Sequence, residues 1–218
     1  NIGHPNFYYS RRIGTRPIGP ATGDYVEYPD SGTILAAAKL TGRLPSKTSV
    51  GLLTAVTDNE EAQVATRGSL DQRTIAVAPH AYHLVGRVLQ EFGPSASTAG
   101  FLVNYVHRQF EEGSPLANLY TRNALGVAGN TTLRFKDGQY EFRGSGGGSL
   151  INGEMGAIER VQRASAHYAQ RPDREYSRLD PTLRSLGGWT VESAFDKTGG
   201  RHWLWCANTK IDSENFET

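Results

Sequence analysis

The sequence predicts an all-β fold: an antiparallel, up-and-down sheet of the transmembrane β-barrel type, with about eight strands and one short helix in a long outer loop. Three observations predict this fold class. Apolar and polar residues alternate with a period of two, helical periodicity is confined to one stretch, and tight turns alternate strictly with long connections. A sheet of up-and-down strands whose two ends differ has this layout.

Eight stretches have the alternation and the bounding turn residues of strands. They are 32–42, 48–58, 73–92, 98–109, 123–136, 139–151, 183–196 and 201–211. Tight turns follow every first strand of a pair, at "RLPSK" (43–47), "GPSAS" (93–97), "DG" (137–138) and "TGG" (198–200). Long connections follow every second strand, at 59–72, 110–122 and 152–182. All long connections are therefore expected at one end of the sheet.

The helical stretch lies in the longest connection. In "EMGAIERVQRASAHYA" (154–169), Met155, Ile158 and Val161 recur at helical spacing. The pattern predicts one short helix in the outer loop.

The glycine-rich stretch "GSGGGS" (144–149) has three interpretations: a linker, a phosphate-binding loop or a strand. Neither phosphate-loop motif, G-x-x-x-x-G-K-[ST] or G-x-G-x-x-G, can be laid over it. The hairpin signal Asp137-Gly138 predicts a register that sets Leu133 opposite Phe142 and Arg134 opposite Glu141, with apolar and polar pairs on separate faces. We therefore expect a strand, with a flexible linker as the alternative.

A second hairpin is predicted at Gly199-Gly200, pairing Phe195 with Trp203 and Ser193 with Trp205. The predicted outward, lipid-side residues are Leu125, Val127, Leu133, Phe142, Trp189, Val191, Trp203 and Trp205. Aromatic residues gather beside the tight turns, as in an interfacial girdle. The same aromatics would also suit the core of a soluble β-sandwich, and alternation alone does not separate the two.

Composition narrows the classes of function. The chain has 218 residues, a net charge of +1 and a single cysteine, Cys206. We expect no nucleic-acid partner, and an intrachain disulfide is excluded. No apolar run is long enough for a membrane-spanning helix, but this does not exclude membrane strands. The first residue is Asn1, so we interpret residues 1–218 as part of a single β-barrel domain from a longer chain.

Several segments carry a family resemblance. They are "NFYYSRRIG" (6–14), "ILAAAKLTGRLPSKTSVGLLTAVTD" (34–58), "YHLVGRVLQEFG" (82–93), "AIERVQRASAHYAQRPD" (157–173) and "WTVESAFDKTGGRHW" (189–203). On these segments the chain resembles the C-terminal domain-of-unknown-function family 5916 of Gram-negative bacteria, which follows a carbohydrate-binding family-nine-like module. The resemblance implies an outer-membrane β-barrel, with the lipid bilayer as partner, and no established chemistry. Family members carry bulkier residues where this chain has Gly146 to Gly148.

Arginine and tyrosine side chains are concentrated in two segments expected at the outer end of the sheet, 1–30 and 152–182. Arginine with tyrosine suits sugar stacking and anionic groups. We therefore expect the two segments to touch and form an outer cap that binds a glycan or an anionic envelope ligand. The candidate residues are Tyr9, Arg11, Arg12, Arg163, Tyr168, Arg171 and Asp173. The alternative is a purely structural network that holds the loops in the mouth of a barrel.

Catalysis has little support in the sequence. The loop carboxylates Glu154, Glu159, Asp173, Glu175 and Asp180 have no spacing that fixes a pair. His80 and His83 have a possible metal-ligand spacing without a third ligand, and we expect no catalytic residue, metal or cofactor. The predicted function is non-enzymatic binding or passage of a glycan or other envelope ligand in the outer membrane. The alternatives are a carbohydrate-active enzyme and a soluble β-sandwich binding module.

Overall fold

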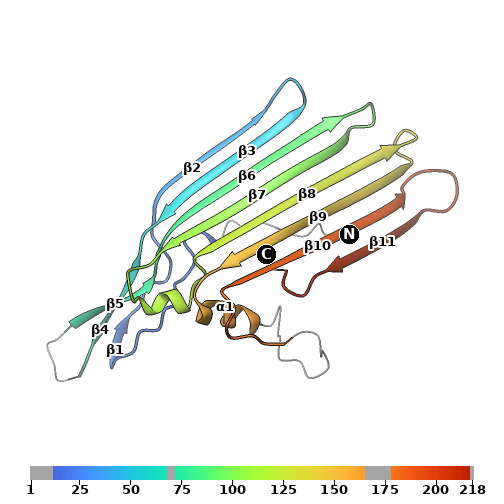
Figure 1. Ribbon diagram of the computed structural model, residues 1–218. Helices are drawn as coiled ribbons and strands as arrows, with labels where there is room; N and C mark the ends of the chain where they lie inside the picture. Colours follow the sequence, from blue (N-terminus) through green and yellow to red (C-terminus); the bar gives the residue numbers. More distant parts are fainter. Residues whose placement is uncertain (1–11, 68–71, 165–177, 217–218) are drawn as a thin grey trace.

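The computed structural model describes residues 12–67, 72–164 and 178–216. About half of these residues belong to one long-stranded antiparallel sheet (Figure 1). Its eight strands are, in order of their neighbours, β11 (Trp205–Asp212), β10 (Ser185–Lys197), β9 (Tyr140–Asn152), β8 (Asn123–Phe135), β7 (Ser97–Gln109), β6 (His80–Phe92), β3 (Thr48–Thr57) and β2 (Ile34–Arg43). Every pairing is antiparallel, as the alternation of the sequence predicts.

The up-and-down order is interrupted once, between β3 and β6. The connection 59–72, predicted from the sequence as a long loop, contains β4 (Glu60–Ala65) and leads into β5 (Gln72–Ala78). These two strands and β1 (Tyr25–Glu27) form a separate three-stranded sheet beyond one end of the large one (Figure 1). The prediction of a single long strand over 73–92 is also wrong, because Pro79 separates β5 from β6.

The glycine-rich stretch is part of a strand, as expected. Gly144 to Ser149 lie inside β9, which pairs with β8 on one side and β10 on the other. The predicted register of the β8–β9 hairpin is confirmed, with Leu133 opposite Phe142 and Arg134 opposite Glu141.

The predicted register of the β10–β11 hairpin is wrong by four residues. Phe195 pairs with Ala207 rather than with Trp203, and the connection runs from Thr198 to Leu204. The chain does not turn at once after Thr198 because the amides of Thr198 and Gly199 donate to the carbonyl oxygen of Gln139, in the neighbouring turn. A shift of four residues leaves Trp205 on the face predicted for it, because strand side chains alternate with a period of two. Trp203, also predicted on that face, lies in the connection instead of in a strand.

The two faces of the large sheet differ in chemistry. One face, here called the apolar face, presents the side chains that share a side with Leu125, Phe142 and Val191. Within the eight strands Lys197 is the only residue with a formal charge on this face, and it lies at the end of β10. The other face, here called the charged face, carries Lys39, Arg43, Arg87, Glu91, Arg108, Arg134, Glu141, Arg143, Glu192, Asp196, Lys210 and Asp212.

Exposure of the two faces is opposite to that of a soluble sheet. On β10, Trp189 is 51% and Val191 is 49% exposed on the apolar face, whereas Glu192 is 7% exposed on the charged face. A soluble antiparallel sheet buries its apolar face and gives its charged face to water.

The helix α1 (Met155–Gln162) is shorter than the predicted 154–169, of which residues 165–169 lie outside the described part of the chain. It packs against the charged face. Ile158 is fully buried in a cluster with Ile151 and Leu186, and Ala124 and Val161 complete the packing. The carboxamide of Gln162 bonds to both the amide and the carbonyl oxygen of Asp180, so this buried polar group is satisfied.

The observed architecture is therefore all-β and antiparallel, with one short α-helix in the long connection. The described residues form two sheets, and β2 and β11 are the unpaired edges of the large sheet rather than a closing pair.

Candidate functional site

Aromatic side chains form a belt on the apolar face at the end with the tight turns. Tyr140 and Phe195 are stacked with ring centroids 6.2 Å apart, and Phe195 lies 5.6 Å from Trp205. Phe92 and Phe135 lie on the same face at the same end of β6 and β8. We call these five residues the turn-end belt.

A second belt crosses the apolar face near the opposite end of the strands. Tyr82 stacks on His107 at 6.2 Å, and the Nδ1 of His107 lies 2.7 Å from the Oδ1 of Asn123. Tyr105 also donates to Asn123, at 2.8 Å. We call these residues the loop-end belt; unlike the turn-end belt, it combines aromatic rings with polar groups that bond across strands.

Aliphatic and glycine residues fill most of the space between the belts. Tyr82 and Phe92 are ten residues apart in β6, about 33 Å along a strand.

The charged face has a network of ion pairs next to the tight turns. The Nε of Arg134 lies 2.9 Å from Glu141, and the Nε of Arg143 lies 3.4 Å from the same carboxylate. Arg143 also contacts Asp196 at 2.5 Å, on the next strand. Each carboxylate is thus neutralised by arginine, and the network links β8, β9 and β10 across the face that has the lower exposure.

The loop end of the sheet carries a cap built from the N-terminal segment and the connection after β7. The amide of Ile18 donates to the hydroxyl of Tyr120 at 2.8 Å, and that hydroxyl donates to the carbonyl oxygen of Val77 at 3.1 Å. The amide of Gly19 also reaches Val77, at 2.9 Å. Burial raises the pKa of Tyr120, so the hydroxyl remains a neutral donor at physiological pH.

The 3-10 helix η2 (Pro115–Asn118) contacts both the N-terminal segment and the connection that contains α1. Leu116 is 3% exposed beside Gly19 of the N-terminal segment, and Gly156 at the start of α1 closely approaches Asn118. Arg160 of α1 donates to the carbonyl oxygen of Leu119 at 3.1 Å. The N-terminal segment and the α1 connection thus contact the same short helix.

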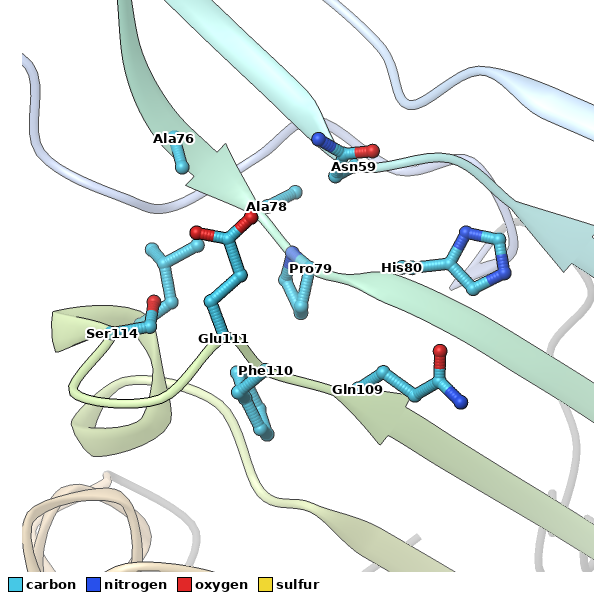
Figure 2. Close-up of a pocket in the computed structure, with 10 residues that line it drawn as sticks. Asn59, Ala76, Ala78, Pro79, His80, Gln109, Phe110, Glu111 and Ser114 are labelled. Carbon is cyan, nitrogen blue, oxygen red and sulfur yellow. The ribbon is translucent and has the colours of Figure 1, made fainter.

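A pocket of about 280 Å³ opens in this cap (Figure 2). In Figure 2 the Glu111 side chain extends towards Ala76 and Ala78, and the carboxamide of Asn59 lies beyond them. The full lining is Asn59, Ala76, Ala78, Pro79, His80, Gln109, Phe110, Glu111, Ser114 and Leu116. It contains carboxylate, carboxamide, hydroxyl and imidazole groups and neither lysine nor arginine, so it suits hydroxyl-rich ligands better than anions.

Two of the predicted site residues lie in the described part of the chain. Arg12 is exposed, at the start of the N-terminal segment. Arg163 forms an ion pair with Glu159 one helical turn away, at 2.7 Å. The remaining candidates, Tyr9, Arg11, Tyr168, Arg171 and Asp173, lie outside the described residues.

The loop carboxylates that are described have local structural partners. Glu154 pairs with Arg184 at 3.0 Å, and Glu159 pairs with Arg163. Asp180 accepts from the amide and the hydroxyl of Thr182, and these bonds hold its pKa below the ordinary value. Asp173 and Glu175 lie outside the described residues.

His80 and His83 are on opposite faces of β6, because three residues along a strand reverse the side. They cannot bind one metal ion together. Among residues 12–67, 72–164 and 178–216, no group of three or more histidine, cysteine, aspartate or glutamate side chains has a metal-binding arrangement.

Sequence reasoning missed Tyr120, Asn59 and Glu111. Each owes its role to contacts between distant parts of the chain; Ile18 and Tyr120 are 102 residues apart. The signal available was the length of the connections 59–72 and 110–122, since long connections are often functional.

These features define an all-antiparallel β protein whose long-stranded sheet exposes its apolar face. No helix in the described part of the chain has the length and hydropathy needed to cross a bilayer. The chain belongs to the family described as Domain of unknown function (DUF5916), whose profile matches residues 3–218. Neither the curated proteins nor the solved structures include a match to this chain.

Proposed function

We propose that this chain is a segment of an outer-membrane β-barrel, non-enzymatic, with the apolar face in contact with lipid and the charged face towards the interior. One observation carries this proposal: the large sheet exposes its apolar side chains between two aromatic belts and keeps its charges on the other face. Membrane barrels have this inverted distribution, with aromatic girdles at both interfaces.

A soluble β-sandwich accounts less well for the exposure of the apolar face. In a sandwich a second sheet covers the apolar face at a distance of about 10 Å. The three-stranded sheet β1-β4-β5 instead lies beyond the end of the large sheet, where it is part of the cap (Figure 1). Among the described residues, no other sheet is present to cover Trp189 or Phe101, which are 51% and 53% exposed.

Fluorescence quenching by lipid tests the proposal. In a chain whose three tryptophans are replaced by phenylalanine, a single tryptophan is introduced as Phe101→Trp, on the apolar face, or as Leu102→Trp, on the charged face. After refolding into vesicles with brominated acyl chains, we expect strong quenching at position 101 and little at position 102. Equal quenching at both positions, or a chain that folds in buffer without lipid or detergent, would contradict the proposal.

The proposed role of the cap is to bind a glycan or another envelope ligand. The pocket supports this part, since its volume suits one sugar unit and its lining offers several partners for hydroxyl groups. Glu111→Ala is expected to weaken glycan binding about 10- to 100-fold, because a lost hydrogen bond to a charged group is worth about 1.5–3 kcal/mol. Glu112→Ala is the control, since Glu112 is exposed and does not line the pocket.

Arg12 provides a separate test of the charge of the ligand. If the ligand is an acidic glycan, Arg12→Ala lowers its affinity, whereas binding of a neutral glycan stays the same. Screening of glycans with both variants, on protein whose strand content is verified by circular dichroism, separates the two ligand classes. Unchanged binding in Arg12→Ala and in Glu111→Ala would leave the cap as a structural plug.

A further inference from the structure

Two lysines flank the aromatic stack of the turn-end belt. The Nζ of Lys136 lies 5.4 Å from the centre of the Tyr140 ring. Lys197 lies between Tyr140 and Trp205, because it is the register partner of both. Lys197 is also the one charged residue within the strands on the apolar face.

The backbone holds these lysines in place. Lys136 has a φ of 48°, in the left-handed region that a residue with a side chain seldom adopts. The turn that contains it is fixed to the end of β10, since the hydroxyl of Thr198 donates to the carbonyl oxygen of Gly138 at 2.6 Å. Positive φ values are what the turns of tight hairpins require, so the hairpin itself fixes the backbone at Lys136.

The charge of these lysines is not neutralised by the described residues. At the same end of the sheet, Arg43 and Lys47 pair with Glu91, at 2.8 and 3.6 Å. No such ion pair joins Lys136 or Lys197 to a described carboxylate; Lys197 donates to the carbonyl oxygen of His202 at 3.2 Å. Asp137, next to Lys136, is exposed in the turn, and Arg201 adds a further positive charge beyond β10.

We propose that Lys136 and Lys197, with Tyr140, Phe195 and Trp205, form a binding site for the phosphate of an anionic phospholipid. The two ammonium groups contact the headgroup, and the three rings lie against the first part of the acyl chains. Charge complementarity and continuity with the exposed apolar face support a lipid as the occupant, because aromatic residues occupy the interfacial level of a bilayer and basic residues favour anionic lipid there. This inference rests on the membrane role proposed above.

Retention of lipid during purification in detergent tests the site. The chain is refolded into vesicles that contain equal amounts of phosphatidylglycerol and phosphatidylcholine, extracted, and examined by native mass spectrometry for bound lipid. We expect preferential retention of phosphatidylglycerol, and a loss of that preference by about 30-fold in Lys136→Ala/Lys197→Ala, since one basic residue near an anionic surface contributes about a factor of five. Lys210→Ala is the control, because Lys210 lies on the charged face and pairs with Asp212.

Each outcome has a distinct meaning. Equal retention of both lipids by the parent chain, or an unchanged preference in the double variant, overturns the lipid site. Displacement of phosphatidylglycerol by inorganic phosphate alone also overturns it, because the rings would then contribute nothing. The double variant should keep the quenching of tryptophan at position 101 by brominated lipid. Absence of that quenching in the Phe101→Trp chain that keeps both lysines would contradict the membrane role itself, and with it the lipid site.

Discussion

At the scale of single residues, Gly188 on the charged face makes room for the segment that follows β11. After the end of β11, residues 213–216 continue beside the first part of β10. Two hydrogen bonds hold the start of this segment. The amide of Trp189 donates to the hydroxyl of Ser213 at 2.7 Å, and the amide of Ser213 donates to the carbonyl oxygen of Trp189 at 2.8 Å. The backbone of Asn215 and Phe216 then lies against Gly188, in the space that a Cβ atom would need.

Gly188→Ala is therefore expected to displace residues 213–216 and to lower the free energy of unfolding by about 1–3 kcal/mol, the range for overpacked sites. Gly187→Ala is the matched control, because a Cβ at Gly187 would meet Leu150 at 3.5 Å, an ordinary contact. Denaturant unfolding of the two variants in detergent provides the comparison. Equal stabilities would show that the segment after β11 does not lie on β10.

At the scale of elements, α1 is attached to the sheet mainly through Ile158. This side chain is completely buried against Ile151 and Leu186. Ile158→Ala is expected to weaken the attachment of α1 by about 2–5 kcal/mol, from lost burial and the cavity that remains. Met155→Ala, at a position 42% exposed in the same helix, is expected to cost less than about 1 kcal/mol. Hydrogen exchange over 155–162 measures both, and equal protection in the two variants would contradict the packing.

The two faces of β3 give a second prediction at this scale. Leu52 is on the apolar face and 46% exposed, whereas Leu53 is on the charged face opposite Lys39. In lipid, Leu52→Glu is expected to lower the free energy of unfolding by about 2 kcal/mol, because a charge on the lipid face is costly. Leu53→Glu gains a lysine partner across the strands and should change stability by less than about 1 kcal/mol. Urea unfolding in vesicles would contradict the assignment of faces if Leu53→Glu were the less stable variant.

The sequence predicts elements well where signals are local. Asp137-Gly138 is a strong hairpin signal, and the β8–β9 register follows from it. Gly199-Gly200 fails as a predictor because Thr198 and Gly199 bond instead to Gln139, which belongs to another hairpin. The pairing of β1 with β4 and the pocket around Glu111 also depend on contacts between distant residues, which no local pattern encodes.

At the scale of the whole molecule, the large sheet has two unpaired edges. Every residue of β2 and of β11 is exposed, and each of these strands has one hydrogen-bonded neighbour instead of two. Unpaired edges open more readily than strands inside a sheet. In detergent, backbone amide exchange of the 218-residue chain is expected to be slowest in β8 and β9 and to become faster towards β2 and β11. Uniform protection over all eight strands would mean that another strand covers the edges.

The glycines of β9 have a mechanical consequence. Gly147 lies on the charged face, which is the concave side of the proposed barrel, and its register partners there are Ala128 of β8 and Thr190 of β10. Side chains that stand close together on one face resist bending towards that face, and here they are small. Bending towards the charged face is thus least hindered along β9. A bulkier side chain at Gly147 would hinder it and enlarge the radius of the surface that the sheet can form.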